Sequence, residues 1–364
     1  MPLGRDERFS AVARIAEPPS RRNNHLVRTV GNASGPPTER AVCDDEVPAC
    51  RHDAELLRFA EFAVSVGIND FSAQIQILLG PPDIVRKDVD RVDGAVRLSS
   101  EVKRRGGSVV AFVDNIPRRD FRQLAGAAAF RTIFRNRFDA VMVPGALGRV
   151  LAKKFGMASR GVFGGMYGAD PEIFFPPPTN QGRADEFLFV GQFIERKGID
   201  LLSRAFAEVR KRHPSYRLRM VGSGPLRGRL SADGAVVEDF LQPEEVSARY
   251  REAKFFVLPS RDEHWGLVVH EAALCGQVLL VSDAVGSAPD LVASDNGFVF
   301  RANDARALES AMESAIALDE INYDRMSERS RYNARAFGPQ AWARSFLAIL
   351  DYIGVSVERA PVLT

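Results

Sequence analysis

The sequence predicts an α/β protein made of two doubly wound domains, of which the N-terminal one is reduced or incomplete. Three observations indicate this fold class. Short apolar runs alternate with amphipathic stretches in two parts of the chain, a pattern typical of parallel sheets covered by helices. The length of 364 residues suits two domains. The three prolines within 174–178 can continue neither a helix nor a central strand, so this segment is the best candidate for a linker.

The composition predicts a soluble globular protein, because 45% of the residues are apolar and 26% are charged. No apolar run reaches the roughly 18 residues that a membrane-spanning helix needs. The first ten residues are charged and lack the apolar stretch of a secretory signal. Three cysteines are too few for a disulfide framework, so we expect a reducing compartment, the cytoplasm.

Residues 1–53 combine six prolines with many charged and polar residues and show no periodic apolar pattern. Such a segment cannot bury enough apolar surface to offset its ordering entropy, so we expect it to be disordered. Cys43, Cys50 and His52 lie close together within it. They could hold a metal ion, but three candidate ligands in such a segment are a weak indication, and we expect no metal site.

The N-terminal domain, 54–178, shows a thin α/β pattern. We expect a helix over 55–66, buried strands over 108–114 and 140–145, and helices over 123–138 and 147–155. Only two or three strands are convincing here, whereas a complete doubly wound domain has about five or six. The sequence therefore predicts an incomplete sheet.

The C-terminal domain, 183–335, alternates clearly between apolar runs and amphipathic stretches. Strands are expected over 187–190, 217–221, 236–237, 255–258 and 278–281. Helices are expected over 198–212, 243–253 and 267–275. Three more helical stretches follow at about 304–318, 323–335 and 339–353. This is the pattern of a second doubly wound unit.

The net charge of +2 conceals a local asymmetry. Residues 97–160 contain 14 Arg and Lys against 4 Asp and Glu, so the rest of the chain is net acidic. A basic stretch can attract phosphates, an anionic membrane surface or nucleic acid, or it can be a solvated face without a partner. No recognised nucleic-acid-reading motif accompanies it, so we expect no nucleic-acid partner.

Two loops of the C-terminal domain place candidate binding groups at the carboxyl edge of the predicted sheet, where doubly wound sheets bind ligands. Arg196 and Lys197 in the loop 191–198 precede a helix N-terminus, where anions are favoured. They indicate either a phosphate site or a solvated turn. The second loop, Gly222-Ser-Gly-Pro225, lets a ligand approach the backbone. It lacks the full dinucleotide fingerprint, which disfavours an NAD-dependent oxidoreductase.

The loop 259–271 contains more candidate binding groups than any other loop. The amides of Gly266, Leu267 and Val268 would begin a helix and suit a diphosphate. Glu263 and Glu271 flank them, and a carboxylate accepts sugar hydroxyls well. Each acid also has a plainer explanation, since one could stabilise the helix dipole and the other could be a solvated helix residue.

Two histidines of this region, His264 and His270, lack a paired acid or cysteine at a recognised spacing. We expect them to be structural or peripheral. A fourth loop, Ser282-Asp-Ala-Val-Gly286, follows the next strand and adds small residues to the same edge.

Together these elements resemble the retaining, nucleotide-sugar-dependent glycosyltransferases of family four, the glycosyl transferases group 1, which have the GT-B fold. Glu263 and Glu271 match the E-x7-E signature of that family, and Lys197-Gly198 its K-G element. The further matches are Phe189-Val-Gly191, Val221-Gly-Ser-Gly-Pro225, Val257-Leu-Pro-Ser260 and Gly168-Ala-Asp170 with Phe174. The resemblance covers about residues 138 to 305.

The resemblance implies two Rossmann-like domains that face a cleft, with the helix of 336–364 crossing back to the N-terminal domain. It implies that Glu271 binds the donor ribose and that Glu263 faces the transferred sugar as the catalytic residue. Lys197 and the amides near 266–268 would hold the donor diphosphate.

Three further positions complete the implied donor site. The backbone near Gly222 and Leu241 would border the base. The family has an arginine where Gln192 stands, and Arg196 is close enough to compensate. The family needs no metal or other cofactor, because protein cations and a helix terminus offset the charge of the leaving diphosphate.

The resemblance therefore implies a hexosyltransferase that moves a sugar from a UDP- or GDP-linked donor to an acceptor hydroxyl with retention. The acceptor would be a glycan or lipid-linked precursor in cell-surface polysaccharide or glycolipid synthesis. The basic stretch 97–160 would then contact anionic lipid at the inner membrane face, or a phosphorylated acceptor. The alternative is a non-catalytic or truncated nucleotide-sugar-binding protein with a defective acceptor domain. In its favour, no acceptor-side histidine of the family has a counterpart between His52 and His213.

Overall fold

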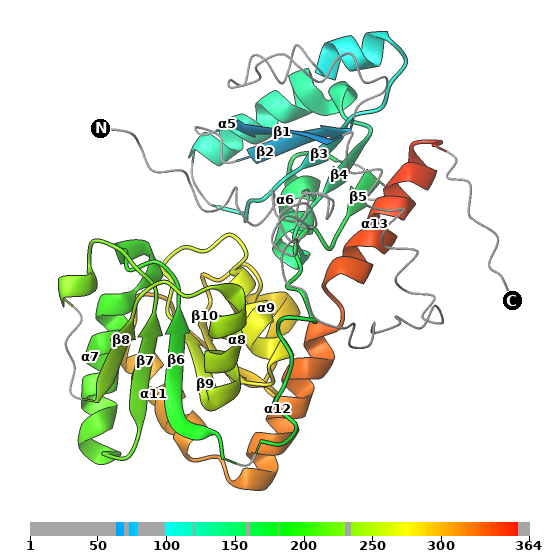
Figure 1. Ribbon diagram of the computed structural model, residues 1–364. Helices are drawn as coiled ribbons and strands as arrows, with labels where there is room; N and C mark the ends of the chain where they lie inside the picture. The colour runs from blue at the N-terminus through cyan, green and yellow to red at the C-terminus, as the bar shows by residue number, and fades with distance from the viewer. Residues whose placement is uncertain are drawn as a thin grey trace, which may run out of the picture.

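The computed structural model describes strands 63–68 and 73–78 and residues 99–118, 121–157, 161–180, 182–229 and 234–355. These residues form two α/β domains, one above the other in Figure 1. The segment 1–53, expected to be disordered, and its Cys43, Cys50 and His52 lie outside the described residues. No helix in the described part of the chain is both long and apolar enough to span a bilayer.

The N-terminal domain contains a parallel sheet with the order β3-β4-β5 and an antiparallel hairpin, β1-β2. The strands are β1 (Ala63–Ile68), β2 (Ala73–Leu78), β3 (Val110–Phe112), β4 (Ala140–Met142) and β5 (Val162–Phe163). The two main helices are α5 (Phe121–Ala129) and α6 (Ala146–Lys154). Within the described residues the parallel sheet has three strands, which agrees with the reduced domain predicted from the sequence.

Two helix predictions in this domain are wrong in part. The described end of the helix expected over 55–66 is strand β1, because Val64, Val66 and Ile68 alternate with small residues as a strand requires. The helix expected over 123–138 is regular only to Ala129 and continues as a π-helix and a 3₁₀ turn. Phe130 stacks on Phe138 at 5.7 Å between ring centroids, which draws this end of the helix onto the core.

The C-terminal domain has one six-stranded parallel sheet with the order β11-β10-β9-β6-β7-β8. Its strands are β6 (Ala184–Val190), β7 (Arg217–Val221), β8 (Ala235–Glu238), β9 (Ala253–Leu258), β10 (Val278–Ser282) and β11 (Gly297–Phe300). All the strands predicted for this domain form, with bounds that differ by a few residues. The sequence did not predict β11, because a four-residue strand that opens on glycine gives little β signal.

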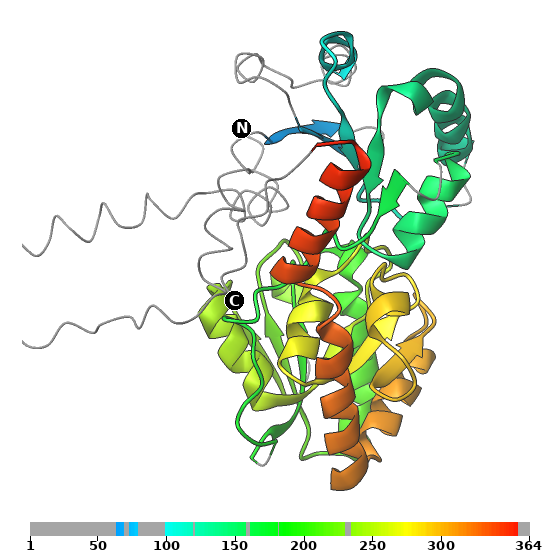
Figure 2. The same ribbon diagram turned by 90° about the vertical axis from the view of Figure 1, so that its right-hand side faces the viewer.

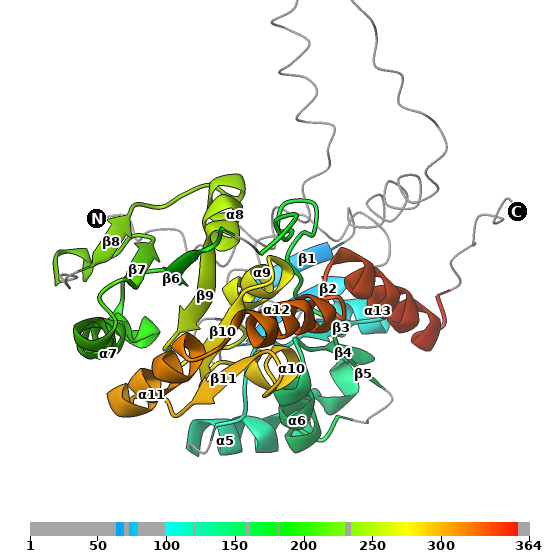
Figure 3. The same cartoon turned by 90° about the horizontal axis from the view of Figure 1, so that it is seen from below.

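Helices cover both faces of this sheet. They are α7 (Ile199–Arg212), α8 (Pro243–Glu252), α9 (Leu267–Leu274), α10 (Ala288–Leu291), α11 (Ala305–Ile316) and α12 (Glu320–Ala334). Figure 3 shows α7 and α11 on one face and α8, α9 and α12 on the other. Central strands β9 and β10 are buried along nearly their whole length, as expected for a parallel sheet covered on both sides.

The chain crosses between the domains twice. The first crossing leads from β5 to β6, and the second leads from α12 to the last helix, α13 (Pro339–Tyr352). Figure 2 shows α13 alongside the N-terminal domain, where Ile349 joins a core with Val110 and Met142. The two crossings touch, because a Cβ built on Gly168 would lie 2.2 Å from the Cα of Gly338.

Candidate active site

The carboxyl ends of β6, β7, β9 and β10 lie at the edge of the C-terminal sheet that faces the N-terminal domain (Figure 1). Loops follow each of these strands, and they contain most of the residues that the sequence singled out, whereas Glu271 lies on α9 and Leu241 follows β8. Loops at this edge also contact the N-terminal domain directly, since Arg118 donates to Asp262 at 2.5 Å between Nη2 and Oδ2. The candidate site therefore lies between the two domains.

Glu263 is the buried carboxylate at the centre of this edge, with 9% of the residue exposed. Its Oε2 accepts a hydrogen bond from Nζ of Lys197 and lies 3.5 Å from Nη1 of Arg196. Burial opposes ionisation of Glu263, but the charges of Lys197 and Arg196 outweigh it and hold the pKa of this carboxyl below its ordinary value. Two cations thus face one carboxylate, which leaves a net positive charge.

Backbone contacts fix the loop that carries Lys197. Gly198 has φ +67°, and a Cβ there would lie 2.1 Å from the carbonyl oxygen of Pro259, so the close approach requires glycine. Arg196 donates to the carbonyl of Asp262 at 2.7 Å. The two strand-end loops therefore lie side by side, and the glycine that follows Lys197 allows this close contact.

The loop after β10 supports Glu263 from the other side. The Glu263 N–H donates to the carbonyl of Ala284 at 3.1 Å, and the Gly286 N–H donates to the carbonyl of Glu263 at 2.8 Å. The structure thus assigns a supporting role to the loop 282–286. It brings no acidic or basic side chain to Glu263, whose charged partners come from the loop after β6.

The helix α9 starts beside Glu263. Its N-cap, Gly266, has φ +84° and provides no side-chain cap. A Cβ on Gly266 would lie 3.2 Å from Cγ of Glu263, so the backbone passes close to that side chain. The amides of Gly266, Leu267 and Val268 belong to the first turn, whose N–H groups have no partners within a helix. Such a terminus favours an anion.

Glu271 lies one turn further along α9. Its Oε2 accepts a hydrogen bond from the Tyr250 hydroxyl at 2.9 Å. Burial raises the pKa of Glu271 to about 7, although the bond from Tyr250 acts in the opposite direction. Glu271 is therefore partly buried and bonded to Tyr250, so it is not a fully solvated helix residue.

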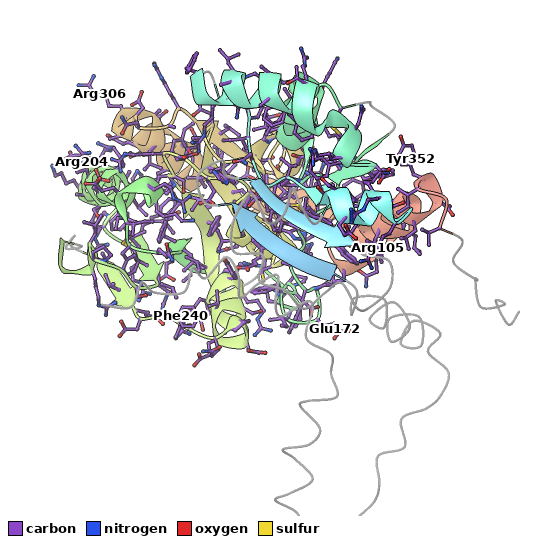
Figure 4. All side chains as sticks on the ribbon, turned by 90° about the horizontal axis from the view of Figure 1, so that it is seen from above. Arg105, Glu172, Arg204, Phe240, Arg306 and Tyr352 are labelled. Atoms are coloured by element: carbon purple, nitrogen blue, oxygen red, sulfur yellow. The ribbon has the colours of Figure 1, made fainter. Side chains whose placement is uncertain are left out.

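The remaining predicted donor-site residues lie along the same edge. Gly222 ends β7 with φ +147°, and a Cβ there would lie 2.0 Å from the carbonyl oxygen of Gly191. Leu241 follows β8, the neighbour of β7, and packs partly against the core. Beside it Phe240 is 55% exposed and lies at the rim of the C-terminal domain in Figure 4. Gln192 directly follows the glycine that ends β6 and is partly buried.

His270 has a structural position, as expected. It is fully buried, and its Nδ1 accepts from the Ala169 N–H at 2.8 Å while Nε2 contacts the Ala334 carbonyl at 2.9 Å. These two residues lie on the two domain crossings. Burial lowers the pKa of His270 to about 4, so the ring is neutral and donates from Nε2. His264 is peripheral and faces Arg118, with 3.3 Å between Nε2 and Nη2.

Two contacts between the domains were missed by sequence reasoning. One is the Arg118–Asp262 ion pair. In the other, both carboxylate oxygens of Asp290 accept from the Ala146 N–H at the start of α6, at 3.0 and 3.1 Å. A Cβ on Gly145 would lie 2.4 Å from Oδ2 of Asp290 and 2.6 Å from Cζ3 of Trp265, so a larger residue there would displace these side chains. The sequence indicated the Pro-Gly turn after β4, but it did not indicate that Asp290, 144 residues after Ala146, would contact it.

Residues 171–336 match the family described as glycosyl transferases group 1. Among curated proteins, the chain is 31% identical over 175 residues to the GDP-mannose-dependent alpha-(1-6)-phosphatidylinositol monomannoside mannosyltransferase of Mycolicibacterium smegmatis, covering 41% of this chain and 46% of the relative. It is 33% identical over 170 residues to the D-inositol 3-phosphate glycosyltransferase of Corynebacterium aurimucosum, covering 43% and 39%. The chain spans about half the length of the curated relatives it matches.

Solved structures share the fold over more of the chain. Anabaena Alr3699/HepE in complex with UDP superimposes with a TM-score of 0.61 at 14% identity, over 71% of this chain and 75% of that one. Sucrose-phosphate synthase from Thermosynechococcus elongatus gives a TM-score of 0.57 at 19% identity, over 71% of each chain. Residues 171–336 of the chain are thus similar to the glycosyl transferases group 1 family, and the chain has the GT-B fold.

Proposed function

We propose that this protein is a retaining hexosyltransferase that moves a sugar from a nucleotide-diphosphate sugar to an acceptor hydroxyl. One observation carries the proposal: Lys197 and Arg196 meet the buried Glu263 beside the uncapped start of α9, at the carboxyl edge of the sheet. This edge is where doubly wound sheets bind ligands. The family match over residues 171–336 supports the transferase class.

The charges at this edge suit a diphosphate. Lys197 and Arg196 together exceed the charge of Glu263, and the free amides of the first turn of α9 add partial positive charge. We infer that these groups hold the donor diphosphate and stabilise its additional charge as it leaves. In this proposal the cations do the work without a metal ion, and Arg196 takes the place of an arginine at position 192.

The two carboxylates differ in surroundings, and this difference suggests their roles. Glu263 is ionised beside two cations, so it can face the sugar ring and stabilise positive charge that develops there. Glu271 is held by Tyr250 further along α9 and would accept the ribose hydroxyls. Gly222 and Leu241, on neighbouring strand ends, would border the base.

The names of relatives support a nucleotide sugar as donor. One curated relative is named GDP-mannose-dependent, and one solved neighbour was crystallised with UDP. We therefore propose a UDP- or GDP-linked hexose as donor, and a glycan or lipid-linked acceptor in cell-surface polysaccharide or glycolipid synthesis.

We further propose that the basic stretch 97–160 contacts an anionic membrane from the cytoplasmic side. Phe121 and Leu124 on α5 and Val150 on α6 are 82%, 57% and 55% exposed, which is unusual for large apolar side chains. Arg131 is exposed on the π-helix that continues α5, and Lys153 is exposed on α6. Apolar side chains beside cations suit the interface of an anionic bilayer.

Vesicle co-sedimentation tests this contact. The protein should sediment with vesicles that contain phosphatidylglycerol and not with pure phosphatidylcholine, and added salt should weaken binding. Replacing Phe121 and Leu124 with serine should reduce it. Ile321→Ser, which changes an equally exposed residue on α12, serves as the matched control. Equal binding by both variants would refute the contact.

The transferase reaction itself is tested by incubating the chain with UDP- and GDP-linked hexoses and glycan or lipid-linked acceptors, in buffer with a metal chelator. Release of nucleotide together with a glycosidic product that retains the anomeric configuration of the donor, followed by NMR, is the expected result. Glu263→Gln should abolish it while nucleotide binding remains. Inversion of configuration would refute the retaining mechanism.

The alternative is a protein that binds nucleotide sugars without turnover. The three-stranded parallel sheet in the described part of the N-terminal domain favours it, because the acceptor side has less scaffold than a full doubly wound domain. Tight binding of one nucleotide sugar, with no release of nucleotide in the presence of any acceptor, would support this alternative.

A further inference from the structure

The buried hydroxyl of Tyr250 is the one side-chain donor to Glu271 among the described residues. Tyr250 is fully buried on α8, and its ring packs between Phe174 of the linker and Phe256 of β9, with ring centroids 5.9 and 5.8 Å away. The ring cannot move without disturbing the core. The position of its hydroxyl is therefore fixed by the fold.

The two oxygens of the Glu271 carboxylate differ in their surroundings. Tyr250 holds Oε2 at 2.9 Å, so Oε1 is the oxygen without a donor from the described part of the chain. The same hydroxyl lies 3.3 Å from the carbonyl oxygen of Val268, in the first turn of α9. A phenol has a single proton and two lone pairs. It can donate to ionised Glu271, or accept from protonated Glu271 while donating to Val268.

We propose that Tyr250 is a positioning residue for the donor nucleotide: it fixes one oxygen of Glu271 and leaves the other to accept the ribose hydroxyls. This inference rests on the proposed function, in which Glu271 binds ribose. It adds a residue from outside the strand-end loops, on a helix that carries no other part of the proposed site.

The proposal also predicts how donor binding depends on pH. The pKa of Glu271 is raised to about 7 by burial, and the Tyr250 bond favours the ionised form that accepts both ribose hydroxyls. Burial raises the pKa of the neighbouring Cys275 thiol to about 12, so this thiol stays protonated and uncharged over the tested pH range. Arg183 and Arg251 act on that thiol rather than on Glu271.

The test measures the affinity for UDP, GDP and ADP between pH 5.5 and 9 in wild type and in Tyr250→Phe. Wild-type affinity for the bound nucleotide should rise as pH passes through about 7. In Tyr250→Phe the midpoint should move up by about one pH unit, the size expected from losing a hydrogen bond to a carboxylate. Affinity at pH 7 should then fall about five-fold and recover at pH 9.

Two further variants make the result specific. Tyr323→Phe removes the hydroxyl of another buried tyrosine, which lies on α12 and donates to the carbonyl of Lys254 in β9, and it should leave the profile unchanged. Glu271→Gln should remove the rise in nucleotide affinity near pH 7. The nucleotide phosphate also titrates, but its effect on affinity is the same in all variants. The Glu271→Gln measurement can be made even if Tyr250→Phe fails to fold.

Three outcomes decide between the claims. A loss in Tyr250→Phe that is equal at every pH, or no loss at all, overturns the role of Tyr250. A rise near pH 7 that persists in Glu271→Gln overturns it as well. If no nucleotide binds folded wild-type protein at any pH, the proposed function itself fails, and the role of Tyr250 fails with it.

Discussion

Replacing Lys197 with methionine keeps the length of the side chain and removes only its charge and its bond to Glu263. Both side chains are 12% exposed, so Glu263 would lose its nearest counter-charge in a buried setting. Breaking a buried pair by removing one partner costs about 3–5 kcal/mol. Arg196 at 3.5 Å compensates in part, so we expect a loss of about 2–3 kcal/mol.

The assay is urea unfolding of the C-terminal domain, followed by the fluorescence of Trp265 in a Trp342→Phe background. Lys211→Met is the control, because Lys211 pairs with Glu208 on the exposed surface of α7, where solvent screens the pair and its loss should cost far less. A Lys197→Met cost no larger than this control would refute the view that the pair is buried and strongly coupled. In Glu263→Gln the Lys197 substitution should cost much less, since the two act as one unit.

The same pair predicts a dependence on pH. The folded-state pKa of Glu263 lies below its unfolded value, so its contribution to stability is present above the ordinary glutamate pKa and is lost as pH falls through the lowered value. The stability difference between wild type and Lys197→Met should therefore shrink as the pH falls below about 4.5. A difference that stays constant with pH would mean that it comes from packing.

Three further predictions concern the contacts between the domains. Asp290→Ala should lower stability by about 0.5–2 kcal/mol, as loss of a helix cap does. It should also lengthen the distance between fluorophores placed on the two domains. The control Asp304→Ala, which removes the cap of α11, should lower stability and leave that distance unchanged. Gly168→Ala should lower the free energy of unfolding by about 1–3 kcal/mol because its Cβ meets the backbone of Gly338. Gly228→Ala, with open space around it, should change that free energy by no more than about 0.5 kcal/mol. The pKa of His270 is lowered to about 4, so the unfolded state takes up a proton first, and stability should fall by about 3 kcal/mol as the pH drops from 6.5 to 4. Urea unfolding of His270→Gln at several pH values should lack this fall. An equal fall in His270→Gln would contradict the buried neutral ring.

The C-terminal domain could be predicted well because its signals are local. Buried parallel strands such as Phe255–Leu258 appear as short apolar runs, and Gly276 ends the helix before the next strand. The N-terminal domain was harder. Its strands β3 and β4 have three residues each, and the described end of a supposed helix is a strand.

The site was predictable where its residues directly follow strands. Lys197 and Glu263 are 66 residues apart but meet because neighbouring parallel strands β6 and β9 end at the same edge. Tyr250 was missed because its only sequence signal, the spacing from Val246 on one helix face, indicates a core residue. Asp290 and Arg118 were missed because their partners belong to the other domain, and no local pattern shows which surfaces will meet.

The measurement that tests the central claim most directly is nucleotide binding by thermal shift. Folded wild type is compared with Glu271→Ala and with Glu328→Ala, which changes an exposed glutamate on α12, in the presence of UDP, GDP, ADP and NAD. Ligand at 100 times its dissociation constant adds about 2.7 kcal/mol of stability. We predict a shift with UDP or GDP that is retained in Glu328→Ala and lost in Glu271→Ala. No shift with any diphosphate nucleotide, or one that Glu271→Ala keeps in full, would contradict the donor site described above.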